Sequence, residues 1–223
     1  MPPSRLITPC VLSLTLLALA GCSGSGDDGP AAPPPASAAS SPSSSPAQPP
    51  GSGGGTPLGG GKTGVTVSLP TGWKQVDPAT DTSPVVQTSF HLSGDSGEII
   101  KELIGEQQKL GVVFAIDSAT TSGYAPNLSA GCDSGGLIGT DLETLKNKEL
   151  KLNPGAQITD LTVSGKPGFK MTHTSTGRDG IATDQIEVNV PVPGDRFCFV
   201  NLAAAKGTMP PASEQILSSF TLG

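Results

Sequence analysis

Hydrophobic and polar residues alternate along the second half of the chain, between residues 156 and 203. Alternation with a period of two puts successive side chains on opposite faces of a strand, so each alternating run predicts a strand. Segments rich in Gly, Pro and Asp separate the runs and predict tight connections. The predicted strands are AQITDLTV (156–163), GFKMTHTS (168–175), DQIEVNVPV (184–192) and RFCFVNLA (196–203).

The first half of the domain mixes short strand-like runs with one helical pattern. VTVSL (65–69) alternates and predicts a first strand, which ends before a proline. The apolar runs VVQTSF (85–90) and VVFAID (112–117) predict two more strands. Between these two runs, SGEIIKELIGEQQKLG (96–111) predicts a helix that begins at a Ser cap and ends at Gly.

Two further segments predict helices. In TDLETLKNKELKLNPG (140–155), Thr140 and Glu143 form a capping-box pattern, and leucines recur at helical spacing. PPASEQILSSF (210–220) predicts a last helix that begins at proline. Strands with short connections and segregated helices together predict an α+β domain, with a mainly antiparallel sheet flanked by helices.

The N-terminus has the features of a bacterial lipoprotein signal. Arg5 precedes an apolar run from residue 6 to residue 20, which is shorter than the ~20 residues of a spanning helix. The run ends in LAGC (19–22), which resembles the lipobox. We therefore expect residues 1–21 to be a signal peptide and Cys22 to carry diacylglycerol, which anchors the chain to the membrane; an ordinary signal peptide that contains a Cys is the alternative.

The segment that follows Cys22 has the composition of a disordered tether. Residues 23–61 contain no aromatic residue and one large aliphatic residue, Leu58. Such a segment cannot bury enough apolar surface to order itself, and it would span roughly 35 Å. We expect residues 22–61 to be the tether and residues 62–223 to form a single domain, held on the extracytoplasmic face of the cell membrane.

The charge and the cysteines narrow the possible partners. Thirteen Lys and Arg against 19 Asp and Glu give a net charge of −6, which argues against nucleic acid as a partner. No cofactor motif lies in a suitable context, so we expect no cofactor. Outside the cytoplasm, Cys132 and Cys198 predict a disulfide, and a metal site that combines them with His91 or His173 is the weaker alternative.

Short motifs along the domain resemble those of a known family. VSLPTGW (67–73), VSGKPGFKMTHT (163–174) and EQILSSF (214–220) look like the LpqN-type lipoproteins of actinobacteria, which resemble the PsbP-like and DcrB-like fold. The resemblance spans residues 64–222 and implies a cell-envelope binding or accessory protein without an agreed catalytic centre. The segment GYAPNLSAGCDSGG (123–136) departs from the family pattern, so a disulfide at Cys132 would be specific to a subgroup.

Ser134 lies in CDSGG (132–136), whose letters match the surroundings of the nucleophile in trypsin-like proteases. That mechanism needs a base His earlier in the chain. Only His91 precedes Ser134, and its SFHLSG context offers no match. We therefore predict a turn fastened by the disulfide, and no catalytic residue.

Three residues are candidates for ligand contact. His173 alternates with Phe169 and Met171, so it should share their sheet face, either as a partly buried histidine or as a ligand contact. Trp73 should pack into the core, or it could line a groove beside Tyr124. Three carboxylates are expected on the solvated face of the 140–155 helix: Asp141, Glu143 and Glu149.

These features favour a membrane-anchored, non-catalytic binding or accessory module of the cell envelope. Its partner would be an envelope lipid or a membrane protein, in lipid assembly or transport. An envelope hydrolase is the alternative, if the fold joins His173 and Asp184 or Asp133 with Ser134. A structural spacer without a ligand is a further alternative.

Overall fold

The computed structural model describes residues 55–94, 96–134 and 141–223. The predicted signal peptide, Cys22 and residues 23–54 lie outside this range.

Antiparallel pairing joins the strands of the described residues into two sheets. The larger sheet has seven strands in the order β3-β4-β5-β9-β8-β7-β6. The smaller sheet has three, in the order β1-β2-β10. The strands of the larger sheet are β3 (Trp73–Val76), β4 (Val113–Asp117), β5 (Asn127–Ser134), β6 (Gln157–Val163), β7 (Lys166–Thr176), β8 (Ala182–Val192) and β9 (Arg196–Ala205). Those of the smaller sheet are β1 (Thr56–Gly59), β2 (Val65–Leu69) and β10 (Thr221–Leu222).

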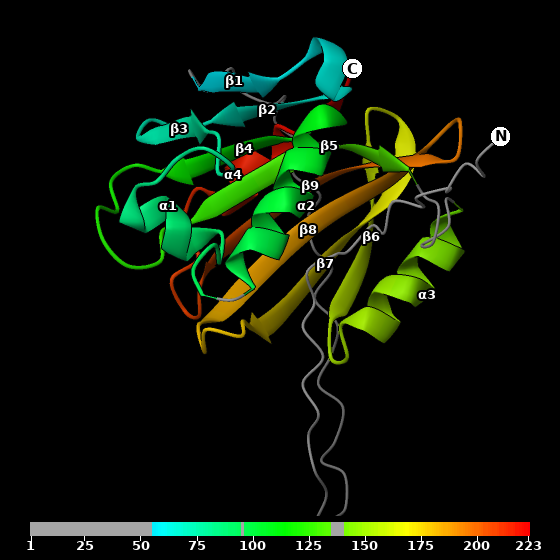
Figure 1. Ribbon diagram of the computed structural model, residues 1–223. Helices are drawn as coiled ribbons and strands as arrows, with labels where there is room; N and C mark the ends of the chain where they lie inside the picture. Colours follow the sequence, from blue (N-terminus) through cyan, green and yellow to red (C-terminus); the bar gives the residue numbers. More distant parts are fainter. Residues whose placement is uncertain (1–54, 95, 135–140) are drawn as a thin grey trace, which may run out of the picture. The chain divides into compact units, whose positions relative to one another are not determined.

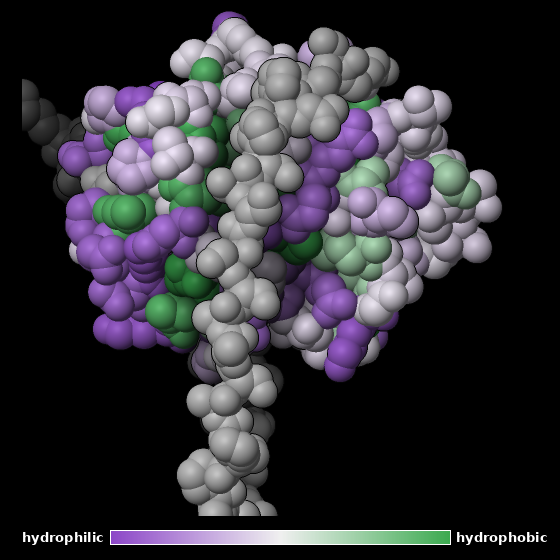
Figure 2. Space-filling model, turned by 180° about the vertical axis from the view of Figure 1, so that it is seen from behind, coloured by the Kyte–Doolittle hydropathy of each residue, from purple (hydrophilic) through white to green (hydrophobic). Residues whose placement is uncertain are grey.

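Helices cover the larger sheet. They are α1 (Pro84–Ser89), α2 (Gly97–Lys109), α3 (Leu142–Leu152) and α4 (Ser213–Ser218), and a 3-10 turn, η1 (Gly61–Thr63), follows β1. Helices α1, α2 and α3 lie on the near side of the larger sheet, whereas α4 lies behind it (Figure 1). Seen from the other side, hydrophobic residues form separate patches between hydrophilic ones (Figure 2). The predicted α+β class, with an antiparallel sheet flanked by helices, is confirmed.

The two faces of the larger sheet belong to two hydrophobic cores. One core joins the sheet to β1, β2 and α4, and includes Val200, Leu202 and Ile216. The other joins the opposite face to α1, α2 and α3, and includes Phe114 and Phe169. Because both faces are covered, several polar side chains of the central strands are buried or half-buried.

The run VVQTSF, predicted as a strand, is helix α1. Pro84 occupies the first turn, where its missing N–H costs nothing, and the N–H of Ser83 bonds to Asp81 Oδ1 at 2.8 Å. Val86 and Phe90, four residues apart, both lie in the core between the larger sheet and helices α1, α2 and α3. Tertiary packing therefore overrides the strand preference of the β-branched residues.

The folded domain begins before residue 62, so the predicted tether boundary is wrong at its C-terminal end. Strand β1 pairs with β2, and Leu58 within it is 1% exposed. One apolar side chain in a Gly-rich segment is a weak sequence signal, but it fills a site in the core.

Cys132 and Cys198 form the predicted disulfide. They face each other directly in the register of β5 and β9, with Cα atoms 3.9 Å apart. The predicted turn at residues 131–137 is wrong for its described part, since residues 131–134 continue β5 and residues 135–137 lie outside the described range. A bridge between neighbouring strands needs no turn to bring the sulfurs together.

The 140–155 helix is confirmed as α3, but its N-cap is Asp141. The Asp141 carboxylate accepts a hydrogen bond from the Thr144 N–H at 2.9 Å. Thr140, the predicted cap, lies outside the described residues.

Candidate functional site

A cavity of about 190 Å³ lies between the larger sheet and the helices on its near side. Helix α2 contributes Ile100, Ile104 and Gln107, and α3 contributes Glu149. The floor consists of side chains from strands β4, β5, β7, β8 and β9. Helix α2 ends at Lys109, and Gly111 with φ +96° then turns the chain back toward β4.

Strand pairing explains why the floor of the cavity is polar. Directly opposed residues in neighbouring strands point to the same face of a sheet. Two rows of such residues cross the larger sheet beneath the helices. The first row is Met171, Glu187, Asn201 and Ser129, and the second is His173, Gln185, Ala203 and Asn127.

Two glutamates meet in the cavity. Glu149 of α3 is only 1% exposed, and its Oε2 accepts a hydrogen bond from Asn153 Nδ2 at 3.2 Å. Burial and the neighbouring charge of Glu187 raise the pKa of Glu149 to about 8. Burial also raises the pKa of Glu187, despite a 3.0 Å hydrogen bond from Asn189. Because neither carboxyl ionises easily beside the other, the pair retains a proton at neutral pH.

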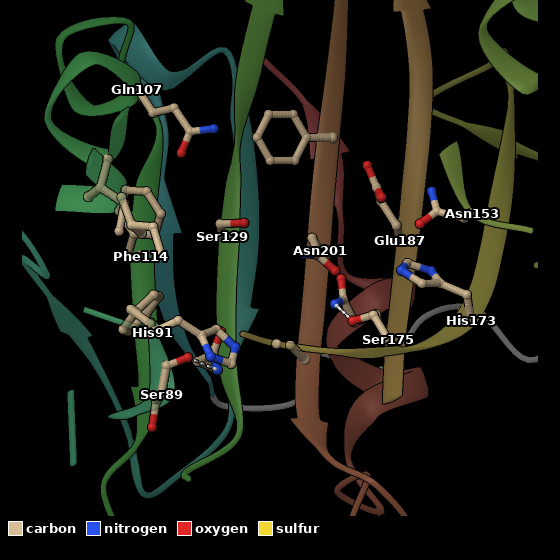
Figure 3. A pocket seen from close by; sticks show the side chains of 18 of the residues that line it. Ser89, His91, Gln107, Phe114, Ser129, Asn153, His173, Ser175, Glu187 and Asn201 are labelled. Carbon is tan, nitrogen blue, oxygen red and sulfur yellow. Dashed lines mark hydrogen bonds between the residues drawn. The ribbon is translucent and has the colours of Figure 1, made fainter. Parts of the chain in front are cut away.

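His173 of β7 lies beside Glu187 and Asn153 (Figure 3). Both of its ring nitrogens are shielded from solvent, and neither has a hydrogen-bond partner in the described part of the chain. Burial lowers the pKa of His173, so the ring is neutral near pH 7 and presents one donor and one acceptor. The Oδ1 atom of Asn201 is likewise buried and unpartnered among the described residues.

A hydrogen-bonded cluster lies at another part of the cavity, where His91 and Tyr124 line it. His91, which follows α1 with φ +54°, contacts Asp179 of the β7–β8 turn at 2.7 Å. Burial alone would raise the pKa of Asp179, but hydrogen bonds from His91 and the Ile181 N–H outweigh it and lower that pKa. The Tyr124 ring lies 5.5 Å from that of His91.

Asn127 of strand β5 holds the Tyr124 side chain by a hydrogen bond. Asn127 Nδ2 donates to Tyr124 Oη at 3.0 Å and to the Ser89 carbonyl at 3.1 Å. Burial raises the pKa of Tyr124 to about 12, so it stays protonated. These contacts, together with the His91–Asp179 pair, tie the end of α1 to the strands.

The structure brings together some of the predicted ligand-contact residues and separates others. Tyr124 and His173 both line the cavity. Trp73 does not, since it packs against the core on the other side of the sheet. Phe169, Met171 and His173 share one sheet face, as predicted, because they alternate along β7.

The hydrolase arrangement considered from the sequence does not form. Asp184 lies on the opposite face from His173, where Thr174 Oγ1 and the Gly207 N–H bond to its carboxylate. Asp133 lines the cavity, but the neighbouring Ser134 is exposed at the end of β5. His173 lies beside Glu187 instead (Figure 3).

Glu149 was expected on the solvated face of α3, and this expectation is wrong. It lies four residues after Leu145, which is fully buried, so both residues fall on the face turned to the sheet. That spacing is visible in the sequence and could have identified Glu149. Glu187 was predicted only as a polar position of a half-buried strand.

Neither a metal centre nor a membrane-spanning helix is found among the described residues. No group of three or more His, Cys, Asp or Glu side chains there could hold a metal ion. No helix in the same part of the chain is long and apolar enough to cross a membrane.

The similarity to known proteins is at the level of fold. Neither the protein-family models nor the curated proteins contain a match to the chain. A solved protein of Bacteroides thetaiotaomicron is similar over 76% of this chain, with 10% identity and a TM-score of 0.44; the chain spans 48% of that protein's length.

Two further solved structures match over most of their own length. LpqN of Mycobacterium tuberculosis, described as involved in cell envelope biogenesis, is 14% identical with a TM-score of 0.43, over 77% of this chain and 87% of LpqN. CyanoP, the PsbP of Synechocystis sp. PCC 6803, is 13% identical with a TM-score of 0.42, over 75% and 92% of the two chains. No residue of the cavity is carried over from these proteins.

Proposed function

We propose that the chain is a lipid-anchored protein of the cell envelope, whose domain binds a small molecule in the cavity without transforming it. The observation that carries the proposal is a cavity with a polar floor, in which the buried ring nitrogens of His173 and the buried Oδ1 of Asn201 have no hydrogen-bond partner among the described residues. Leaving a buried polar group unsatisfied costs about 1–3 kcal/mol, so a ligand that bonds to these groups would be favoured.

Two features support a location in the cell envelope, outside the cytoplasm. The LAGC motif supports lipidation of Cys22, and a disulfide is at home outside the cytoplasm. We expect Cys22→Ser to move the protein from the membrane fraction to the soluble fraction. Cys10→Ser is the matched control, because Cys10 would leave with the signal peptide; equal membrane attachment of both variants would contradict the proposed anchor.

Binding in the cavity is tested on the full chain as its host makes it. The protein is extracted from the envelope with mild detergent, weighed by native mass spectrometry and then denatured. We expect a small molecule to be released on denaturation. Ser129→Leu, which fills the cavity from β5, should abolish retention of this molecule. Its retention by the filled variant would show that it binds elsewhere, and an empty wild-type protein would contradict the proposal.

The cavity also sets a limit on what can bind. At about 190 Å³ it is too small to enclose a lipid with two acyl chains, so an envelope lipid could enter only by its headgroup. A spacer would need no such cavity.

Hydrolysis is the second candidate function, and one observation favours it. His173 and Glu187 lie in one cavity, where an imidazole and a carboxyl of raised pKa could act as base and acid. Turnover of ester or glycoside substrates that is lost in His173→Gln would support this function. Release of an intact ligand from wild-type protein, without turnover, would exclude it.

A further inference from the structure

The cavity lining carries acidic groups, and two imidazoles are the basic side chains among its described residues. Glu149, Glu187 and Asp133 line it, and no Lys or Arg is among the described residues that do so. Asp133 uses its Oδ1 to accept the Ser134 N–H at 2.6 Å. The two glutamates have no cationic partner within the cavity lining.

The lining also holds hydrogen-bond acceptors with free capacity at the glutamates. Among the described residues, Glu149 accepts a side-chain hydrogen bond from Asn153 and Glu187 accepts one from Asn189. A carboxylate can accept several more hydrogen bonds. The Oδ1 of Asn201 points into the same region and has no partner in the described part of the chain. A ligand that fits this end must bring N–H or O–H donors.

Four phenylalanines belong to the cavity lining. Phe114 and Phe90 approach from the β4 and α1 side, with ring centroids 5.7 Å apart, and Phe197 and Phe199 line the cavity from β9. Aromatic faces attract organic cations and also bury apolar groups. The cavity therefore has an acidic end and an aromatic wall.

We infer that the cavity binds a small organic cation, in which a protonated amine is attached to a compact apolar group. The ammonium would bond to the carboxyls of Glu149 and Glu187 and to Asn201, and the apolar group would lie against the phenylalanines. An ammonium supplies three donors, one for each of these two carboxyls and one for the Asn201 oxygen. A cavity of ~150 Å³ holds benzene, so about 190 Å³ suits a molecule of similar size better than a bare metal ion.

The inference rests on the proposed function. Three probes of nearly equal shape distinguish a site specific for a cation from a cavity that binds any small molecule. Benzylamine, benzyl alcohol and benzoate carry a positive, zero and negative charge on the same ring. They are titrated calorimetrically at pH 8 into residues 22–223 with Cys22→Ser, which removes the lipid and the need for detergent. We expect benzylamine to bind at least about tenfold more tightly than benzyl alcohol, a difference of ~1.4 kcal/mol, and benzoate to bind least.

Variants test whether the glutamates recognise the charge. Glu187→Gln and Glu149→Gln should each reduce the preference for benzylamine to less than about threefold. Glu143→Gln on the outer side of α3, where Glu143 is 75% exposed, is the matched control and should keep the preference. If Glu187→Gln does not fold, the Glu149→Gln result decides.

The outcomes separate the two claims. Benzyl alcohol binding as tightly as benzylamine overturns the cation site but leaves the proposed function standing. Failure of benzylamine to bind also overturns the cation site. The proposed function is then tested independently by the molecule recovered from the envelope. A preference that survives in both glutamine variants overturns the assignment to these residues.

Binding of a cation should also release a proton. A positive charge favours the ionised form of the glutamate pair, which retains a proton at neutral pH. The affinity for benzylamine should therefore rise severalfold between pH 6 and pH 8. The other titratable groups of the lining are His173 on β7, Asp133 on β5, Tyr124 before β5 and His91 after α1; the described lining from α2 has none. Affinity that is constant over this range would contradict the proton release.

Discussion

The substitution Glu149→Gln should stabilise the protein, and the gain should grow with pH. In the unfolded chain the Glu149 carboxyl has its ordinary pKa of 4.5, whereas burial beside Glu187 raises the folded value to about 8. A raised acid pKa contributes stability that is fully present below pH 4.5 and is lost as the pH rises through 8. Glutamine has nearly the same shape but cannot ionise in the unfolded chain, so it avoids this loss.

The magnitude follows from the two pKa values. At pH 7 the unfolded carboxyl is ionised and the folded one is mostly protonated, so the penalty spans the 2.5 units between pH 4.5 and pH 7. At ~1.4 kcal/mol per unit, Glu149→Gln should gain about 3–4 kcal/mol at pH 7. The side-chain oxygen of the glutamine can still accept the hydrogen bond from Asn153, so little is lost in return.

Urea denaturation between pH 4.5 and pH 9 measures this difference. The fluorescence of Trp73, the only tryptophan, reports unfolding from the opposite face of the sheet. The exposed Glu143→Gln serves as control and should track the wild type at every pH. The reasoning is refuted if the gain from Glu149→Gln is the same at pH 5 and at pH 8.

Three other perturbations test separate parts of the fold. Replacing both Cys132 and Cys198 with Ala should lower the free energy of unfolding by about 4 kcal/mol, since the bridge closes a loop with a sequence separation of 66; an unchanged urea midpoint would contradict this. Asp179→Asn should change the free energy of unfolding by less than ~1 kcal/mol, because His91 and Asp179 are partly exposed. Stopped-flow measurements should nevertheless show that this variant releases benzylamine from the cavity faster than the wild type does. Leu58→Ala should cost about 2–5 kcal/mol in thermal or urea unfolding, and a neutral effect would exclude β1 from the folded unit.

The sequence predicted best those elements whose pattern is long and regular. Strands β6 to β8 alternate over 7 to 11 residues each, β9 opens with an apolar run, and all four lie next to their sequence neighbours, so local turns and sequence pattern determine them. Short elements that depend on distant partners were missed or misassigned. Helix α1 has six residues, and its Val86 becomes helical only because the sheet and α2 supply a core for it. Strand β1 is held by pairing with β2 and by the burial of Leu58.

In the candidate site, too, the sequence alone predicted some residues and missed others. Tyr124 and His173 could be selected because aromatic and imidazole side chains are few in the chain. Glu149 could not be distinguished from other helix carboxylates by composition, although its position four residues after Leu145 places it on the buried face. That His173 meets Glu187 rather than Asp184 depends on strand register, which alternation alone leaves open by one residue.

The alternation of polar and apolar residues along β8 does not place its polar face in open water in this fold. Gln185, Glu187 and Asn189 alternate with apolar residues, which ordinarily indicates one face toward the core and the other toward water. Here helices cover the polar face, and the apolar face is covered by the smaller sheet and α4. These polar groups therefore face a cavity rather than open water, and they bond to one another or to what the cavity holds. Because Asn201, which lines the cavity, keeps an unpartnered oxygen among the described residues, mutual bonding is incomplete, and this favours a bound molecule that donates hydrogen bonds.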